Sequence, residues 1–432
     1  MSGLRVVAGG LLFAVTCAAM SAEGERSPAF KEFDRRAKAG ERLIVVFFGA
    51  SLTWGANASD PQLTSYRALI GRRLEEAYPQ ARFRFYDAAI GGTGSQLGVF
   101  RFEREVLRRK PDLVFLDFSA NDDIYGNDAE TLASYESLVR RTILDAKAPI
   151  VEVIFPFMWN VSGGSLGGMK RRDAHIAIGK AYNVPVGDAI ALAQQRVKAK
   201  ETTIAQLWPF DGVHPGDAGY VLFADAAWQA FQSGVEQGLV CTPPEKMLNP
   251  DTYMKNARVR ISTLGELPQG WRVGVPNPVS AFFDMLMSRW LDDETIASNR
   301  KEVTENGKKK PVPQDVARLK VKFSGSMVML YGEATPKSCK YRAYIDGKLV
   351  EHQEGQKKDV LQEFDGGKLS KLVKGNTHHA QVIATGLDPA IEHTLEIEPV
   401  FAADPQPLAA GDGEQELRLE SICVAGGQAT VR

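Results

Sequence analysis

The alternation of short apolar runs with amphipathic segments between Arg42 and Ser233 constrains the fold of this chain most strongly. Five runs rich in Val, Ile, Leu and Phe are each followed by a segment with the apolar period of a helix. Continuous apolar runs are typical of strands buried on both faces, and strands that alternate with helices form parallel sheets. We therefore predict an α/β domain built on a doubly wound sheet of five parallel strands. The predicted strands are 43–50, 82–90, 111–120, 148–157 and 184–190, and the predicted helices are 65–79, 97–110, 130–147, 170–183 and 217–233.

After about Val240 the sequence follows a different pattern. A Pro-rich connection, "CTPPEKMLNP" (241–250), precedes eight short runs rich in β-branched and aromatic residues, several of which alternate with period two. The letters "IDGK" (345–348) indicate a tight hairpin turn. We predict an all-β sandwich that is jelly-roll-like, interrupted by a helical stretch at 279–298. The predicted strands are 257–263, 270–276, 317–323, 326–334, 340–351, 379–387, 393–401 and 417–425.

The length of 432 residues gives a prior of two or three domains. The predicted organisation is a signal peptide at 1–22, the α/β domain at 23–238, a linker at 239–254 and the β-sandwich at 255–432. The signal peptide is inferred from Arg5, the apolar run that follows it and the small residues near Ser21, and it predicts export to the periplasm or beyond. A lipoprotein signal at Cys17 is the alternative, although Thr16 before it fits poorly. No other stretch is long and apolar enough for a membrane helix.

Charge and cysteine content exclude several classes of protein. A net charge of −1 gives no strong field for nucleic acid or an anionic membrane, and lysines 308–310 are predicted to form a solvated loop. Without Cys17, the mature chain keeps Cys241, Cys339 and Cys423, whose spacing matches no zinc site. Buried free thiols are favoured, and a Cys339–Cys423 bridge remains open.

The strand at 43–50 ends in the loop "GASLTWG" (49–55), which places Ser51 at the carboxyl end of a buried strand. Ligand sites of open α/β sheets lie at that edge. A serine needs a base, a group that orients the base, and donors for the oxyanion. The segment "DGVHPG" (211–216) supplies Asp211 and His214 before the last helix, and Gly92 and Asn121 follow the second and third strands. A glycine amide and an asparagine amide are suitable oxyanion donors.

Together, "GASLTWG", "IGGTGS", "SAND" and "DGVHPG" resemble, in order, the four sequence blocks of the SGNH (GDSL-type) hydrolase superfamily, over about residues 42–235. The resemblance implies a flavodoxin-like fold and a serine esterase without metal or organic cofactor. It implies Ser51 as nucleophile, His214 and Asp211 as its partners, and an oxyanion hole of Ser51, Gly92 and Asn121. Gly91 is the alternative to Gly92. The first block has Ala where many members have Asp, a change that the mechanism tolerates.

The identity of the ester is less constrained by the sequence. An α/β-hydrolase elbow is disfavoured, because Ser51 is not followed by the second glycine of G-x-S-x-G. The predicted export, the appended sandwich and Trp54, Trp159 and Trp208 near strand ends favour O-deacetylation of a polysaccharide or glycan. A lipase or thioesterase of the same fold and a non-catalytic glycan-binding protein remain alternatives.

Overall fold

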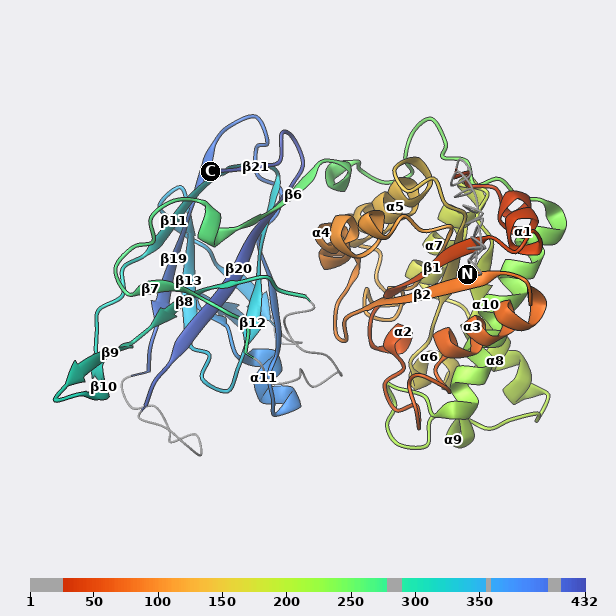
Figure 1. The fold of residues 1–432 in the computed structure, drawn as a ribbon, viewed down its shortest axis with the longest axis horizontal. Coiled ribbons are helices and arrows are strands. Elements are labelled where there is room, and N and C mark those ends of the chain that lie inside the picture. Colours follow the sequence, from red (N-terminus) through yellow and green to blue (C-terminus); the bar gives the residue numbers. More distant parts are fainter. Residues whose placement is uncertain (1–25, 278–289, 355–358, 403–412) are drawn as a thin grey trace, which may run out of the picture.

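The computed structural model describes residues 26–277, 290–354, 359–402 and 413–432. The predicted signal peptide and residues 279–289 of the predicted helix lie outside the described residues. Figure 1 shows an α/β domain and a β-rich domain side by side.

The first domain is built on a five-stranded parallel sheet, as predicted, and its strands lie in the order β2-β1-β3-β4-β5. Its strands are β1 (Arg42–Gly49), β2 (Arg82–Ala89), β3 (Leu113–Leu116), β4 (Ile150–Ile154) and β5 (Val186–Asp188). Every residue of β3 and β4 is buried, which explains their unbroken apolar sequences.

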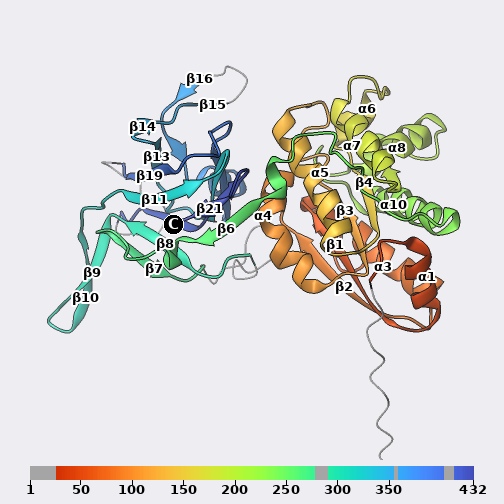
Figure 2. The same ribbon diagram turned by 90° about the horizontal axis from the view of Figure 1, so that it is seen from above.

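Two groups of helices cover the sheet, with α4 and α5 on one side and α3, α8 and α10 on the other (Figure 2). The long helices are α3 (Tyr66–Ala77), α4 (Ser95–Glu105), α5 (Ala129–Leu144), α7 (Lys170–Ala181), α8 (Ala189–Lys198) and α10 (Asp217–Gln237). The short helices are α2 (Ser51–Trp54), α6 (Met158–Ser162), α9 (Ile204–Leu207) and η1 (Leu107–Arg109). A further helix, α1 (Phe30–Lys38), was not predicted; Phe33 packs edge-on against Phe231 of α10.

The second domain contains two six-stranded antiparallel sheets, which form the predicted sandwich. One sheet contains β11 (Leu319–Ser324), β13 (Lys340–Ile345), β14 (Lys348–Leu349), β17 (Phe364–Asp365), β19 (His393–Val400) and β21 (Thr430–Val431). The other contains β6 (Asn256–Arg260), β7 (Trp271–Gly274), β8 (Glu294–Ser298), β12 (Met327–Ala334), β18 (Thr377–Ala384) and β20 (Glu416–Ala425). The remaining elements are η2 (Thr252–Met254), η3 (Ile261–Thr263), β9 (Arg300–Glu305), β10 (Lys308–Pro313), β15 (His352–Glu354), β16 (Asp359–Leu361) and α11 (Lys368–Val373).

Two local predictions in this domain were wrong. Glu294–Ser298 is strand β8 rather than helix, because it pairs with β20 on one side and β7 on the other. Lysines 308–310 belong to strand β10, which forms an exposed hairpin with β9. Pro311 is tolerated because this two-stranded hairpin leaves one edge of β10 unpaired.

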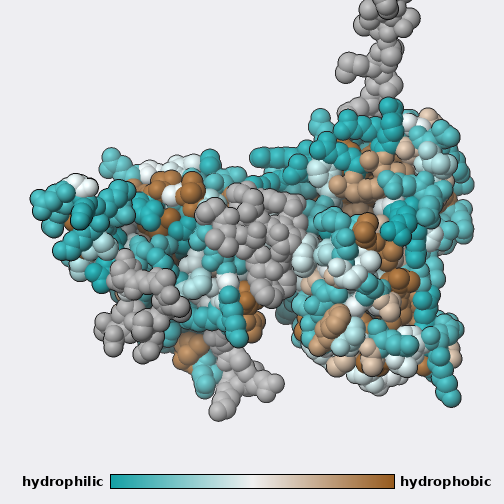
Figure 3. All heavy atoms as spheres, turned by 60° about the horizontal axis from the view of Figure 1, so that its bottom comes forward, coloured by the Kyte–Doolittle hydropathy of each residue, from teal (hydrophilic) through white to brown (hydrophobic). Residues whose placement is uncertain are grey.

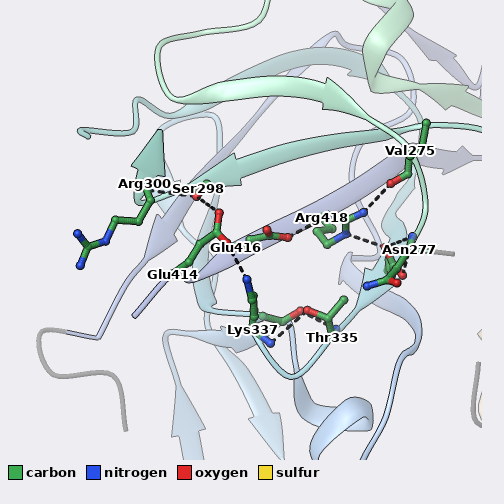
Figure 4. A network of polar contacts seen from close by, with 11 residues as sticks. Val275, Asn277, Ser298, Arg300, Thr335, Lys337, Glu414, Glu416 and Arg418 are labelled. Carbon is green, nitrogen blue, oxygen red and sulfur yellow. Dashed lines mark hydrogen bonds and ion pairs between the residues drawn. The ribbon is translucent and has the colours of Figure 1, made fainter. Parts of the chain in front are cut away.

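The face of β20 that points away from the sandwich core carries a buried polar network (Figure 4). Arg418 donates to Glu333 at 2.6 Å, to Glu416 at 2.9 Å and to the carbonyl oxygen of Val275 at 2.7 Å. Because Arg418 is only 7% exposed, these contacts replace the water that its charge would otherwise require. They link β20 to β12 and to the segment that follows β7.

The two domains share an apolar contact. Trp290, Leu291, Met329 and Tyr331 of the second domain belong to the same buried cluster as the core of the first. Trp290 is 4% exposed, and its carbonyl oxygen accepts a hydrogen bond from Arg104 of α4 at 3.3 Å.

The connection between the domains is held on the surface of the first. The fully buried carboxylate of Glu136 in α5 accepts hydrogen bonds from the backbone N–H groups of Leu248 and Asn249, at 2.7 and 2.8 Å. Tyr253 donates to Glu130 at 2.8 Å and accepts from Gln96 at 2.8 Å. The linker is thus fixed to α4 and α5.

Cys241, Cys339 and Cys423 are buried free thiols.

The exterior in Figure 3 is mostly hydrophilic, with small separate apolar patches. Within the described ranges, no helix combines the length and apolar character needed to cross a bilayer.

Candidate active site

Ser51 lies at the start of α2, directly after β1, and is 2% exposed. The turn requires glycine at position 49, because a Cβ there would collide with the side chain of Thr53 and the carbonyl oxygen of Asp117. As the first residue of a helix, Ser51 has a backbone N–H without an intrahelical acceptor. The sequence therefore places both a hydroxyl and a donor N–H at the sheet edge.

His214 lies in the loop before α10, and its Nε2 is 3.0 Å from Ser51 Oγ. Its side chain is 15% exposed, and burial lowers its pKa below 6.5, although Asp211 opposes this shift. At neutral pH the imidazole is thus neutral and can accept a proton from Ser51.

Asp211 Oδ2 lies 3.6 Å from His214 Nδ1, longer than an ordinary hydrogen bond. Its Oδ1 accepts from the backbone N–H groups of Val213 and His214, both at 2.7 Å. Burial alone would raise the pKa of Asp211, but these bonds and one from Asn57 lower it. The carboxylate is therefore ionised and fixed beside the imidazole.

Asn57 is a residue of this site that the sequence did not reveal. Its side-chain amide donates to Asp211 Oδ2 at 2.8 Å and to the carbonyl oxygen of His214 at 3.4 Å. Its φ of 67° is in the left-handed region, which Asn tolerates better than most residues. Asn57 thus ties the loop after α2 to the loop that carries Asp211 and His214.

Gly92 and Asn121, which follow β2 and β3 in the chain, line one cavity with each other, and Ser51 and His214 are not part of its lining. Gly92 is exposed and has a φ of 74°, whereas Gly91 is buried. A positive φ favours glycine, and this backbone geometry supports Gly92 over Gly91 as the residue whose N–H faces a ligand. Asn121 is half-buried.

A buried arginine holds the loop that contains Gly92. Arg101 of α4 is fully buried and donates to the carbonyl oxygen of Ala88 at 2.6 Å and to Thr93 Oγ1 at 3.1 Å. Its charge is balanced by Glu105 at 2.7 Å. Arg101 therefore connects the end of β2 to the loop that follows it.

Two buried carboxyl groups lie under the site. Asp122 accepts from the backbone N–H of Ser95 at 2.9 Å, which caps α4, and burial raises its pKa to about 7. Burial also raises the pKa of Asp117 to about 7, despite bonds from Ser119. The hydrogen bonds of these two groups go to Ser95, Ser119 and Thr53, so they support the loops around Ser51.

The three tryptophans singled out from the sequence differ in their surroundings. Trp159 of α6 is 45% exposed and lies beside Gly212, between Asp211 and His214 in the chain. Trp54 is half-buried. Trp208 is only 4% exposed and packs against Phe223, which are the surroundings of a core residue and do not favour the predicted contact with a substrate. Across the described residues, no three His, Cys, Asp or Glu side chains are grouped to hold a metal ion.

Comparison with known proteins defines the class to which this site belongs. Residues 47–222 match the model of the GDSL-like lipase/acylhydrolase family. The N-terminal domain is a GDSL-like lipase/acylhydrolase domain, and the chain is accordingly a hydrolase of carboxylic esters.

Two relatives extend this comparison. An acetylxylan esterase of Geobacillus stearothermophilus is 24% identical over 205 residues, which cover 43% of this chain and 92% of that protein. The crystal structure of a two-domain esterase active on acetylated mannans, co-crystallised with mannopentaose, is 22% identical, with a TM-score of 0.69. The match covers 93% of this chain and 95% of that one, so the two proteins share a two-domain fold.

Proposed function

We propose that the protein is an exported serine esterase that removes O-acetyl groups from a polysaccharide or glycan. The observation that carries this proposal is the 3.0 Å contact between Ser51 Oγ and His214 Nε2 at the strand edge of a GDSL-like acylhydrolase domain. The acetylxylan esterase that resembles this domain supports acetylated carbohydrate as the substrate. The predicted signal peptide supports export.

In the proposed first step, His214 takes the hydroxyl proton of Ser51 as Oγ attacks the acetyl carbonyl carbon. Asp211 stabilises the imidazolium that forms. The backbone N–H groups of Ser51 and Gly92 and the side-chain amide of Asn121 donate to the oxyanion. The bond to the sugar oxygen then breaks, and His214 returns the proton to that oxygen.

In the second step, His214 removes a proton from water, which attacks the acetyl group on Ser51 and releases acetate. Ser51 then recovers its proton from the imidazolium. No metal or organic cofactor takes part in this proposal. Trp159 offers an exposed aromatic face next to His214, where the C–H surface of a sugar can pack.

The substrate class is tested with two series of esters. One series is acetylated xylan, mannan and their oligosaccharides, and the other is p-nitrophenyl esters from acetate to octanoate. The proposal predicts acetate release from at least one glycan and a rate maximum at acetyl in the second series. A maximum at octanoate without acetate release from any glycan indicates a lipase or thioesterase instead. No hydrolysis in either series favours a non-catalytic glycan-binding protein.

A further inference from the structure

A cavity of about 830 Å³ lies between the two domains. From the α/β domain it is lined by the loop that begins at Gly92 and by Asn121, the two expected oxyanion donors outside the nucleophile loop. From the second domain it is lined by α11 and β18, including Lys368, Leu372 and His378. One end of this cavity therefore lies at the two expected oxyanion donors, whereas Ser51 and His214 are not among the residues that line it.

The second domain is in direct contact with the loop of Gly92. A Cβ placed on Gly92 would lie 3.9 Å from His378 Cε1 and 3.9 Å from Leu369 Cδ2, which is van der Waals distance. The contact between the domains at this cavity also includes a buried residue. Met329 of β12 lines the cavity and belongs to the apolar cluster shared by both domains.

A polar contact outside the cavity also joins the two domains. Arg104 Nη1 of α4 lies 2.9 Å from Asp292 Oδ1, in addition to its bond to the carbonyl oxygen of Trp290. The relative position of the domains is thus supported by a polar contact as well as by the shared apolar cluster.

The second wall offers hydrogen-bonding groups to a hydroxyl-rich ligand, and its two charged side chains, Asp365 and Lys368, are of opposite sign. Burial lowers the pKa of His378 to about 3 and that of His379 to about 4, so both imidazoles are uncharged at neutral pH. Gln381 adds an amide, and Leu372, which is 77% exposed, adds an apolar surface. Pockets of about 300–1,000 Å³ accommodate drug-sized molecules, so this cavity has room for about two to three sugar rings.

We propose that this interdomain cavity is a glycan subsite that binds the sugar units next to the acetylated one. The inference rests on the proposed function, because the acetyl group must be placed between Ser51 and the oxyanion donors. The second domain then gives the enzyme a preference for acetylated chains over small acetyl esters, which do not reach α11 and β18. Lys368 and Leu372 of α11 are exposed and therefore accessible to a chain, as is Gln353 of β15.

The test is a double variant of these two exposed residues, Lys368→Ala/Leu372→Ser. Its matched control, Lys320→Ala/Ile391→Ser, removes an exposed lysine and an exposed aliphatic residue outside the cavity lining. Both are compared with wild type on p-nitrophenyl acetate and on acetylated oligosaccharides of increasing length, derived from a glycan that wild type deacetylates.

For wild type we expect kcat/KM to rise with oligosaccharide length. For the cavity variant we expect the value on the longer oligosaccharides to fall about tenfold, mainly through KM, because these contacts hold substrate and transition state alike. Hydrolysis of p-nitrophenyl acetate should stay within about twofold of wild type in both variants.

Three results overturn the proposal, and they can be told apart. If wild type shows a length dependence that the cavity variant retains in full, the subsite lies elsewhere while the proposed function stands. If wild type releases acetate from no glycan, the proposed function fails and the subsite fails with it. A loss on p-nitrophenyl acetate equal to the loss on oligosaccharides would show that the cavity residues act on the reaction centre and not on the glycan, and it also overturns the proposal.

Discussion

Replacement of Asn57 by glycine tests whether the position of Asp211 matters for catalysis. The change removes the 2.8 Å hydrogen bond from Asn57 Nδ2 to Asp211 Oδ2, and glycine adopts the φ of 67° without strain. The loss therefore concerns the side-chain amide rather than the backbone.

The magnitude follows from the surroundings of Asp211. A hydrogen bond to a charged group contributes about 1.5–3 kcal/mol when it is well buried. The side chain of Asp211 is 45% exposed, so water replaces part of the lost bond, and we discount the loss to about 0.5–1.5 kcal/mol. If this loss falls on the transition state, kcat/KM decreases about two- to twelvefold, since about 1.4 kcal/mol corresponds to tenfold.

The assay is initial-rate hydrolysis of p-nitrophenyl acetate, with thermal unfolding measured beside it. The matched control is Asn306→Gly, because Asn306 also has a positive φ, of 53°, but lies in the exposed β9–β10 turn. We expect the control to leave the rate unchanged. A rate for Asn57→Gly equal to wild type would refute the reasoning, since the backbone bonds from Val213 and His214 would then suffice to hold Asp211.

Three further predictions concern the base, the oxyanion loop and its support. As the pH is lowered, kcat/KM should fall with a midpoint below pH 6.5, because burial lowers the pKa of His214 and the imidazole must be unprotonated to act as base. A midpoint above pH 6.5 in the pH–rate profile contradicts this prediction. Gly92→Ala should lower kcat at least tenfold, because alanine strains the backbone at a φ of 74°. The control Gly347→Ala, at a φ of 77° in a hairpin turn, should leave the rate unchanged. If Gly92→Ala hydrolyses the ester at the wild-type rate, Gly92 is not part of the oxyanion site. Arg101→Met should lower the free energy of unfolding by about 3 kcal/mol, because it leaves the carboxylate of Glu105 buried without its partner. The double variant Arg101→Met/Glu105→Leu should regain part of this stability. An unchanged melting temperature in the single variant contradicts the supporting role of Arg101.

The features that were predicted from sequence depend on local patterns. The presence and burial of the parallel strands follow from apolar runs such as Leu113–Leu116, whose every residue is buried. The β13–β14 turn follows from the letters Asp-Gly, since Asp346 and Gly347 both have positive φ. Ser51 and His214 were predicted to meet because Ser51 follows the first strand, a serine nucleophile needs a base, and both residues lie in blocks that resemble the SGNH superfamily; they lie 3.0 Å apart.

The features that were missed depend on contacts between distant parts of the chain. Asn57 and Asp211 are 154 positions apart, and no spacing rule connects them. Arg101 and Glu105 have the spacing of an ordinary surface pair on a helix, yet both are buried. Glu294–Ser298 forms a strand only because two neighbouring strands flank it. In each case tertiary packing overrides the local signal.

The most direct test of the central claim is acetate release from an acetylated glycan by wild type and by Ser51→Ala, with circular dichroism to confirm that both are folded. The account predicts that wild type releases acetate and that Ser51→Ala loses at least about a thousandfold in rate while keeping its fold. Acetate release by a folded Ser51→Ala variant at the wild-type rate would contradict the account, because the nucleophile would then lie elsewhere.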